Sequence, residues 1–200
     1  VGYELEHEMD NGVTLRQNLR YSEVDADLEF SGIYAAGTGF GRYWGHYLEN
    51  SENFSVDTYA EGHFSTGAFD HTVVAGFDYT QSSYDAYYGG VGYVSAADTD
   101  AVDQPYSNGQ EMYQYGVYVH DQLSSGPWTM FLSGRYDWVD MTTFDANQNG
   151  TDTSHNGFSG RVGLSYAFNT DLSVYANVSS SFVPTTGLVY DDSTDPNSGR

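Results

Sequence analysis

The stretch GRVGLSYAFNTDLSVYANVSSSF, Gly160–Phe182, has two faces of opposite character. Its even positions include Val162, Leu164, Tyr166, Phe168, Leu172, Val174, Ala176, Val178 and Phe182, and its odd positions include Arg161, Ser165, Ser173, Asn177, Ser179 and Ser181. Because successive side chains of a strand point to opposite faces, the pattern predicts one apolar and one polar face. Asn169-Thr170-Asp171 is a turn signal. The stretch therefore predicts a β-hairpin with arms of about ten residues, close to the length of a tilted strand that crosses a bilayer.

Soluble antiparallel sheets also alternate, so the choice between water and lipid needs the rest of the chain. The same alternation recurs at residues 3–9, 13–21, 54–64, 73–79, 113–119 and 130–138, which gives eight predicted strands. Short turns are expected near 10–12, 65–70, 124–127 and 169–171, and long connections near 23–52, 82–111, 141–157 and 183–200. This strict sorting by length is typical of outer-membrane barrels, which have short periplasmic turns and long extracellular loops.

Composition excludes several classes of function. The 200 residues include 28 acidic and 6 basic side chains, a net charge of −22, so a nucleic-acid partner is not expected. Cysteine is absent, which removes disulfides and thiolate metal sites. No run of 18 apolar residues predicts a transmembrane helix, and the first eight residues are not a signal peptide. The first residues already alternate like a strand and the last residues resemble an unfinished loop, so we expect a piece of a longer chain.

Aromatic and charged side chains fall where a membrane barrel places them. Aromatic residues expected near strand ends on the apolar face are Tyr21, Tyr79, Tyr136, Trp138, Phe168 and Phe182. Rings of this kind form interfacial girdles at the level of the lipid headgroups. The polar face carries Glu6, Arg16, Arg20, Asp57, Glu61, Arg135, Asp137 and Arg161, which suits a wet lumen or a wall that faces a plug.

Three segments carry a family resemblance: NFSVDTYAEGHFSTGAFDHTVVAGFDY (53–79), YGVYVHDQLSSGPWTMFLSGRYDWV (115–139) and GRVGLSYAFNTDLSVYANVSSSFVPTTG (160–187). With ELEHEMDNGVTLRQNLRYS (4–22) they resemble TonB-dependent ferric-siderophore receptors, most closely the ferrichrome and hydroxamate branch. The resemblance implies an all-β, antiparallel transmembrane β-barrel. Residues 1–200 would supply about eight strands from the middle of a 22-stranded barrel, without the plug domain.

What the resemblance implies about function goes beyond these residues. Members of the family bind a ferric siderophore in an outer vestibule and import it with energy from the TonB–ExbB–ExbD system, which grips a TonB box on the plug. The expected partners are thus a ferric siderophore of hydroxamate type, the TonB system through a plug outside this chain, and outer-membrane lipids. The siderophore is the transported ligand, and neither a resident cofactor nor an enzyme activity is expected.

Candidate ligand contacts lie in the aromatic-rich predicted loops 32–49 and 82–93. They are Tyr34, Arg42, Tyr43, Trp44, Tyr47, Tyr87 and Tyr88, since aromatic rings with a few polar groups line most small-molecule sites. The six histidines show no HxxxH or HxH spacing, so direct metal ligation is not expected.

Two other functions fit parts of the pattern. An autonomous eight-stranded outer-membrane barrel with a structural or adhesive role suits the length of 200 residues. An outer-membrane enzyme would need a nucleophile beside a base. His120 and Ser133 face the same way, but nothing in the sequence places them together.

Overall fold

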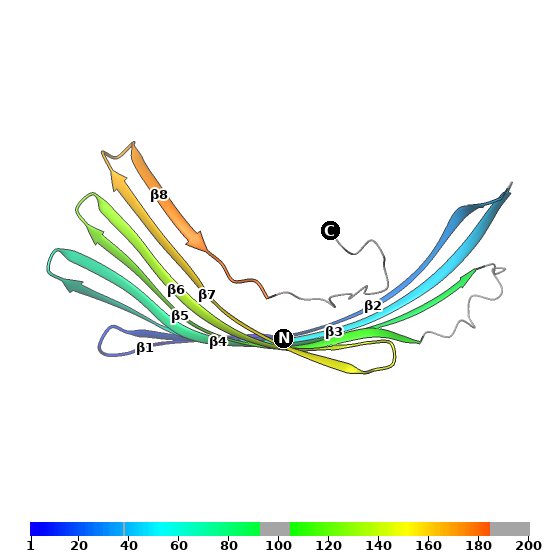
Figure 1. Cartoon of the computed structure of the whole chain (residues 1–200). Helices are drawn as coiled ribbons and strands as arrows, with labels where there is room; N and C mark the ends of the chain where they lie inside the picture. Colours follow the sequence, from blue (N-terminus) through cyan, green and yellow to red (C-terminus); the bar gives the residue numbers. More distant parts are fainter. Residues whose placement is uncertain (38, 93–104, 185–200) are drawn as a thin grey trace.

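The computed structural model describes residues 1–37, 39–92 and 105–184, which form one antiparallel sheet in the order β1-β2-β3-β4-β5-β6-β7-β8 (Figure 1). The strands are β1 (Gly2–Glu8), β2 (Thr14–Ala36), β3 (Gly39–Thr66), β4 (Phe69–Gly92), β5 (Tyr106–Ser125), β6 (Trp128–Phe144), β7 (Gly150–Ala167) and β8 (Ser173–Ser180). The predicted all-β, antiparallel, eight-stranded fold is confirmed. The sheet curves into a trough with one concave and one convex face (Figure 1).

The strands are much longer than the alternating segments from which they were predicted. β2, β3 and β4 have 23, 28 and 24 residues, whereas a strand of about ten residues crosses a bilayer. Ranges expected to be long connections therefore carry strand: β2 continues to Ala36, and β3 already begins at Gly39. We use the term long arms for the parts of β2 to β7 that extend beyond the apolar segments on the side opposite the short turns. Parts of the expected connections 82–111 and 183–200 lie outside the described residues.

The extension has a simple cause in the sequence. From Glu23 to Phe30 acidic residues alternate with apolar ones, so the period of two never breaks. What changes is the face that the apolar residues occupy. The apolar Leu19 and Tyr21 share the convex face with the acidic Glu23, while the apolar Val24 shares the concave face with Arg20. Backbone pairing continues because polar and apolar residues still alternate with the two-residue repeat of a strand, although the two kinds of residue have exchanged faces.

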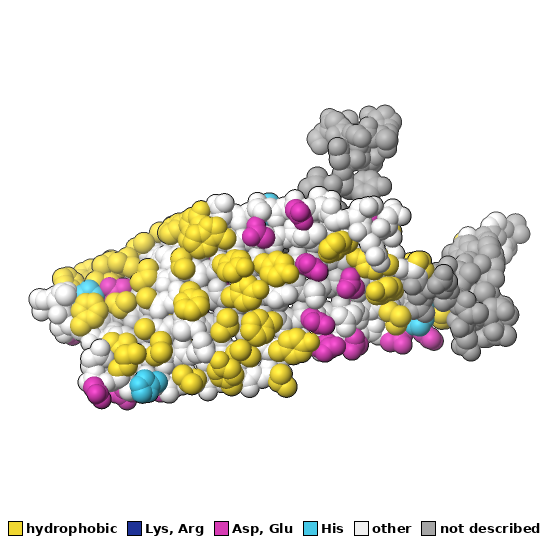
Figure 2. Space-filling model, turned by 90° about the horizontal axis from the view of Figure 1, so that it is seen from below, with side chains coloured by type: hydrophobic (Ala, Val, Ile, Leu, Met, Phe, Trp, Pro, Cys, Tyr) yellow, Lys and Arg dark blue, Asp and Glu magenta, His cyan; other side chains and the backbone are white. Residues whose placement is uncertain are grey.

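The convex face carries an apolar band across the middle of the strands, and acidic side chains gather toward the long arms (Figure 2). Exposed apolar residues of the band include Phe77, Val117, Val119, Leu132, Val162 and Val178. Soluble monomeric proteins rarely expose a contiguous apolar band that crosses most strands of a sheet, so this face is expected to contact something other than water. It has the character of a lipid-facing surface, with the acidic side chains above the lipid level.

Aromatic rings border the band at both ends. Toward the long arms, ring centroids lie 6.2 Å apart for Phe54 and Tyr79 and 5.1 Å apart for Tyr79 and Tyr115. Toward the short turns, Tyr166 lies 4.5 Å from Trp128 and 4.7 Å from Phe168. Two such belts are what a transmembrane β-barrel requires at its two interfaces.

One expected member of these belts, Phe182, lies elsewhere. The prediction for this residue is wrong, because the chain leaves the sheet after Ser180 and the ring turns to the concave face, over Gly157. The alternation of β8 no longer applies there, since β8 ends two residues earlier.

The two edges of the described sheet are not paired with each other. Within the described ranges β1 pairs only with β2, and β8 pairs only with β7. In the same ranges no α-helix is long and apolar enough to cross a membrane.

Candidate functional site

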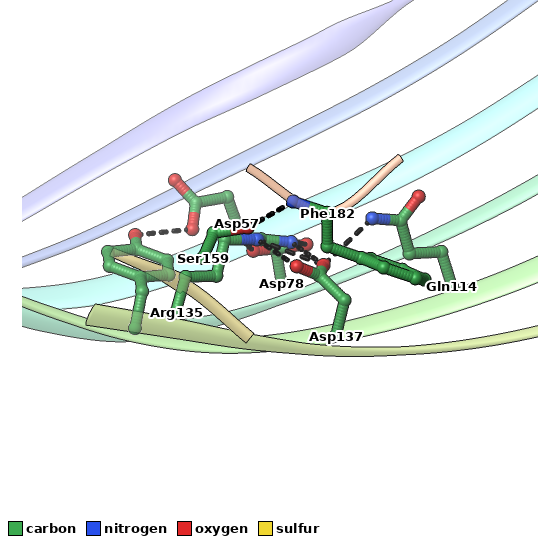
Figure 3. A network of polar contacts seen from close by, with 8 residues as sticks. Asp57, Asp78, Gln114, Arg135, Asp137, Ser159 and Phe182 are labelled. Atoms are coloured by element: carbon green, nitrogen blue, oxygen red, sulfur yellow. Dashed lines mark hydrogen bonds and ion pairs between the residues drawn. The ribbon is translucent and has the colours of Figure 1, made fainter. Parts of the chain in front are cut away.

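Arg135 is the centre of a polar network on the concave face (Figure 3). Its guanidinium donates to both carboxylate oxygens of Asp78, at 2.5 and 2.9 Å, and to Asp137, at 2.6 Å from Nη2. Gln114 donates a 2.9 Å hydrogen bond to Asp137, which is only 4 % exposed. Burying a carboxylate is costly unless it is paired and hydrogen-bonded, and both conditions are met here. The network therefore fixes neighbouring strands to one another.

Gly116 makes this arrangement possible. The register places it on β5 between Asp78 of β4 and Asp137 of β6. A Cβ atom at this position would overlap the Arg135 guanidinium and would lie 2.9 Å from Asp78 Oδ2. Because glycine leaves this space empty, Arg135 reaches from β6 across β5 to β4.

Tyr118 spans three strands in the same way. Its ring lies against Gly76 of β4, and its hydroxyl donates a 2.7 Å hydrogen bond to Asp57 of β3. The Arg135 guanidinium lies 5.9 Å from the centre of the same ring. Together the two side chains connect β3, β4, β5 and β6 on the concave face.

A second ion-pair cluster lies nearer the short turns. Arg16 of β2 donates to Glu6 of β1 at 2.7 Å and to Glu61 of β3 at 2.5 Å. His63 lies 3.2 Å from the other oxygen of Glu61. These charges confirm that the polar residues of the alternating pattern share the concave face.

Beside the Arg135 network the wall is hollowed by a depression of about 540 Å³. Charged and polar residues line it, among them Asn18, Arg20, Asp57, Thr80, Tyr118 and His120. The lining holds two cationic side chains, Arg20 and Arg135, and two carboxylates, Asp57 and Asp78, so the formal charges of the lining cancel.

The chain that leaves β8 docks on this wall. The Phe182 backbone N–H donates a 2.9 Å hydrogen bond to Ser159 Oγ, and its ring occupies the space above Gly157 (Figure 3). The segment 181–184 thus crosses the concave face instead of continuing the sheet.

Tyrosines dominate the concave face of the long arms. The hydroxyls of Tyr47 and Tyr84 lie 2.7 Å apart, in hydrogen-bond contact. Ala86 lies between them in the register and is 1 % exposed. Burial and the Tyr47 hydroxyl, with a smaller contribution from Glu49, raise the pKa of Tyr84 above its ordinary value.

The sequence-predicted contacts divide between the two faces. By strand alternation Tyr43, Tyr47 and Tyr88 share the concave face with Asp57 and Asp78. Three further predicted contacts lie on the convex face: Arg42, Trp44 and Tyr87. Tyr34 pairs with Gly41 in the backbone register.

Sequence reasoning missed two residues of the concave wall. Phe30 lies over Gly45, and its ring centre is 6.3 Å from that of Tyr43. Glu49 shares this face. The signal that predicts both is the unbroken alternation beyond Glu23, because it gives the face of every residue in β2 and β3.

Two alternative chemistries can be compared with the geometry. His120 and Ser133 are direct neighbours in the register of β5 and β6, which the sequence alone did not predict. His120 contacts the ring of Tyr118, and within the described part of the chain no hydrogen bond joins it to Ser133. Among the residues that the structure describes, no group of three or more His, Asp or Glu side chains is placed to hold a metal ion.

An apolar convex face between two aromatic belts, with an ion-paired concave face, defines the wall of a transmembrane β-barrel with a polar interior. The chain belongs to the TonB-dependent receptor family: residues 1–199 match the family model described as "TonB dependent receptor-like, beta-barrel". This confirms the family resemblance and places the chain in the bacterial outer membrane.

Similar proteins agree with this assignment. The ferrioxamine B receptor of Salmonella typhimurium is 33 % identical over 198 residues, which cover 92 % of this chain and 28 % of that protein. The ferrichrome outer membrane transporter/phage receptor of Escherichia coli is 30 % identical over 223 residues, covering 92 % and 30 %. This chain thus spans less than a third of the length of these relatives.

A solved structure extends the likeness to the fold. The ferric-catecholate import receptor of Escherichia coli in its open form superposes with a TM-score of 0.74 at 15 % identity, over 90 % of this chain and 35 % of that one.

Proposed function

We propose that the protein containing this chain is an outer-membrane receptor that binds a ferric siderophore and imports it with TonB-coupled energy. The observation that carries the proposal is the concave tyrosine wall of the long arms, above an ion-paired lumen wall, in a chain of this family. Two relatives named as ferrioxamine B and ferrichrome receptors favour a ligand of hydroxamate type.

The aromatic wall has the chemistry that such a ligand needs. We propose that Tyr43, Tyr47 and Tyr88 contact the chelate, because their rings supply apolar area and their hydroxyls supply hydrogen bonds. Tyr34, which pairs with Gly41 in the backbone register, is kept as a further proposed contact. Arg42, Trp44 and Tyr87 lie on the convex face and serve as matched controls.

The remaining parts of the proposal concern partners. The TonB–ExbB–ExbD system acts through a plug domain outside this chain, and the convex apolar band contacts outer-membrane lipid. No catalytic activity is proposed, because the family is one of receptors. The two unpaired edges of the described sheet disfavour an autonomous eight-stranded barrel, since lipid does not tolerate an open edge.

The test is uptake of radioactive iron by cells whose only siderophore receptor is the full-length protein. Ferrioxamine B and ferrichrome are supplied with and without an uncoupler of the proton gradient. We expect uptake that the uncoupler abolishes and that Tyr47→Ala lowers about tenfold, while Trp44→Ala leaves it unchanged. Absence of saturable binding of every ferric hydroxamate by the folded receptor would contradict the proposal.

A further inference from the structure

The long arms separate charge between their two faces. The convex face beyond the aromatic belt carries Arg42 and nine acidic residues, which are Glu23, Asp25, Asp27, Glu29, Glu52, Asp85, Glu111, Asp140 and Asp152. Figure 2 shows acidic side chains gathered on this part of the convex face. On the concave face of the same arms, above Asp137 and within the described residues, Glu49 is the one acidic side chain, and there is no arginine or lysine. The ligand-facing wall is therefore almost uncharged, with one negative charge.

Glu49 is placed where a ligand on the tyrosine wall would meet it. The register sets it opposite Ala26 of β2 and Ala86 of β4, so its direct neighbours are two small apolar residues. It is half-buried, and Tyr47 and Tyr84 stand next to Ala86 on the same face. A ligand that covers this patch removes water from the carboxylate, which costs free energy unless the ligand supplies a cation or a donor.

Resting on the proposed function, we propose that Glu49 makes this receptor selective for ferric chelates that carry a cationic group. Ferric iron held by three hydroxamates is neutral, and a pendant ammonium adds one positive charge that Glu49 pairs with. A ferric tris-catecholate is strongly anionic, and it would place negative charge against Glu49 without any arginine or lysine on this described part of the wall to compensate.

The experiment measures binding by the purified full-length receptor, by quenching of its tryptophan fluorescence. The probes are ferrioxamine B, which has a free terminal amine, and its N-acetylated derivative, which has the same iron centre without the charge. The variants are Glu49→Gln and, as a matched control, Glu52→Gln, three residues away on the convex face of the same strand.

We expect the wild-type protein to bind ferrioxamine B about tenfold more tightly than the acetylated form, because a charge-assisted hydrogen bond is lost. Glu49→Gln should weaken binding of ferrioxamine B to the level of the acetylated form and leave the latter unchanged. Glu52→Gln should retain the wild-type preference.

Equal affinity of the wild-type protein for both probes would overturn the role of Glu49 and leave the siderophore receptor in place. The role of Glu49 is overturned equally if Glu49→Gln weakens binding of both probes to the same extent, because that is a structural effect. Failure of the folded wild-type protein to bind either probe would count against the proposed function itself, so the two failures are distinguishable.

Discussion

At the scale of single residues, two positions of the concave face must be glycine because other side chains occupy the place of a Cβ atom. At Gly116 the missing side chain is replaced by the Arg135 guanidinium, and at Gly157 it is replaced by the Phe182 ring. Arg135 reaches its glycine from the neighbouring strand β6, and Phe182 reaches its glycine from the segment that follows β8. The glycine is thus part of the contact, although it forms none of its polar interactions.

Gly116→Ala is expected to separate Arg135 from Asp78. The added methyl group occupies the path of the guanidinium, which leaves charges on the wall incompletely paired, at a cost of about 1–3 kcal/mol. The measurement is the thermal unfolding midpoint of the full-length receptor in detergent.

Gly163→Ala is the matched control on the same face. Its new Cβ atom would lie 3.6 Å from the nearest neighbour, an ordinary contact, so the midpoint should hardly change. Equal effects of both substitutions would show that Gly116 matters for strand conformation and not for the ion pair.

Asp145 gives a prediction about pH at the same scale. It accepts hydrogen bonds from the backbone N–H groups of Asn147 and Asn149, at 2.8 and 2.9 Å. Hydrogen bonds from Asn149, side chain and backbone, lower the pKa of this carboxyl in the folded protein. Its stabilisation of the turn is therefore present above the unfolded pKa, about 3.9, and is lost as the pH falls through the lower folded value.

The measurement is an NMR titration of the two asparagine amides in the detergent-solubilised receptor. We expect both to titrate with Asp145, at a midpoint below about 3.9, and to be insensitive to pH in Asp145→Asn. A midpoint at or above that value in the wild-type protein would contradict the hydrogen-bond pattern.

At the scale of elements, the end of β8 decides where the following chain goes. Sequence alternation predicts that Phe182 continues the apolar face, yet β8 ends at Ser180 and the ring docks over Gly157. The bond from the Phe182 N–H to Ser159 replaces a ladder bond with a side-chain contact. This exchange directs the segment across the lumen wall.

Phe182→Ala should release this segment. The ring is partly exposed, so we expect a modest loss of about 1–2 kcal/mol, with increased protease cleavage after Ser180 in the folded receptor. Val183→Ala, at a residue that is 77 % exposed, is the control and should change neither quantity. Unchanged cleavage in Phe182→Ala would show that the ring does not hold the segment.

At the scale of the whole molecule, the described sheet is an open trough whose edges are β1 and β8. An edge strand leaves a row of backbone donors and acceptors unpaired, and lipid offers no replacement for them. The stability of these eight strands therefore depends on further strands that pair with both edges.

Residues 1–200 expressed alone and refolded in detergent should accordingly associate through their edges. We expect species several times larger than 22.1 kDa by size-exclusion chromatography with light scattering. In outer-membrane extracts of the source cells, the polypeptide that contains this sequence should likewise be much larger than 22.1 kDa. A stable 22.1 kDa monomer in both experiments would favour the autonomous barrel.

Much of this molecule is predictable from its sequence because a strand has a period of two. The alternation in Gly160–Phe182 and its repeats predicted the eight strands, their apolar and polar faces and the short turns. The same period continues from Glu23 to Phe30, but the change from apolar to acidic on the outer face made the long arms resemble loops. In the long arms, the two-residue alternation predicts strand more reliably than the polarity of the residues on one face.

What the sequence determined by itself is thus the class of fold, the two faces and the family, since these depend on local periodicity and motif order. Only the tertiary structure decided which long-arm residues face the lumen together, such as Tyr47 with Tyr84, and which ion pairs cross a glycine, such as Arg135 with Asp78. Those contacts join residues 37 and 57 positions apart, and only the register of several paired strands brings them within hydrogen-bond distance.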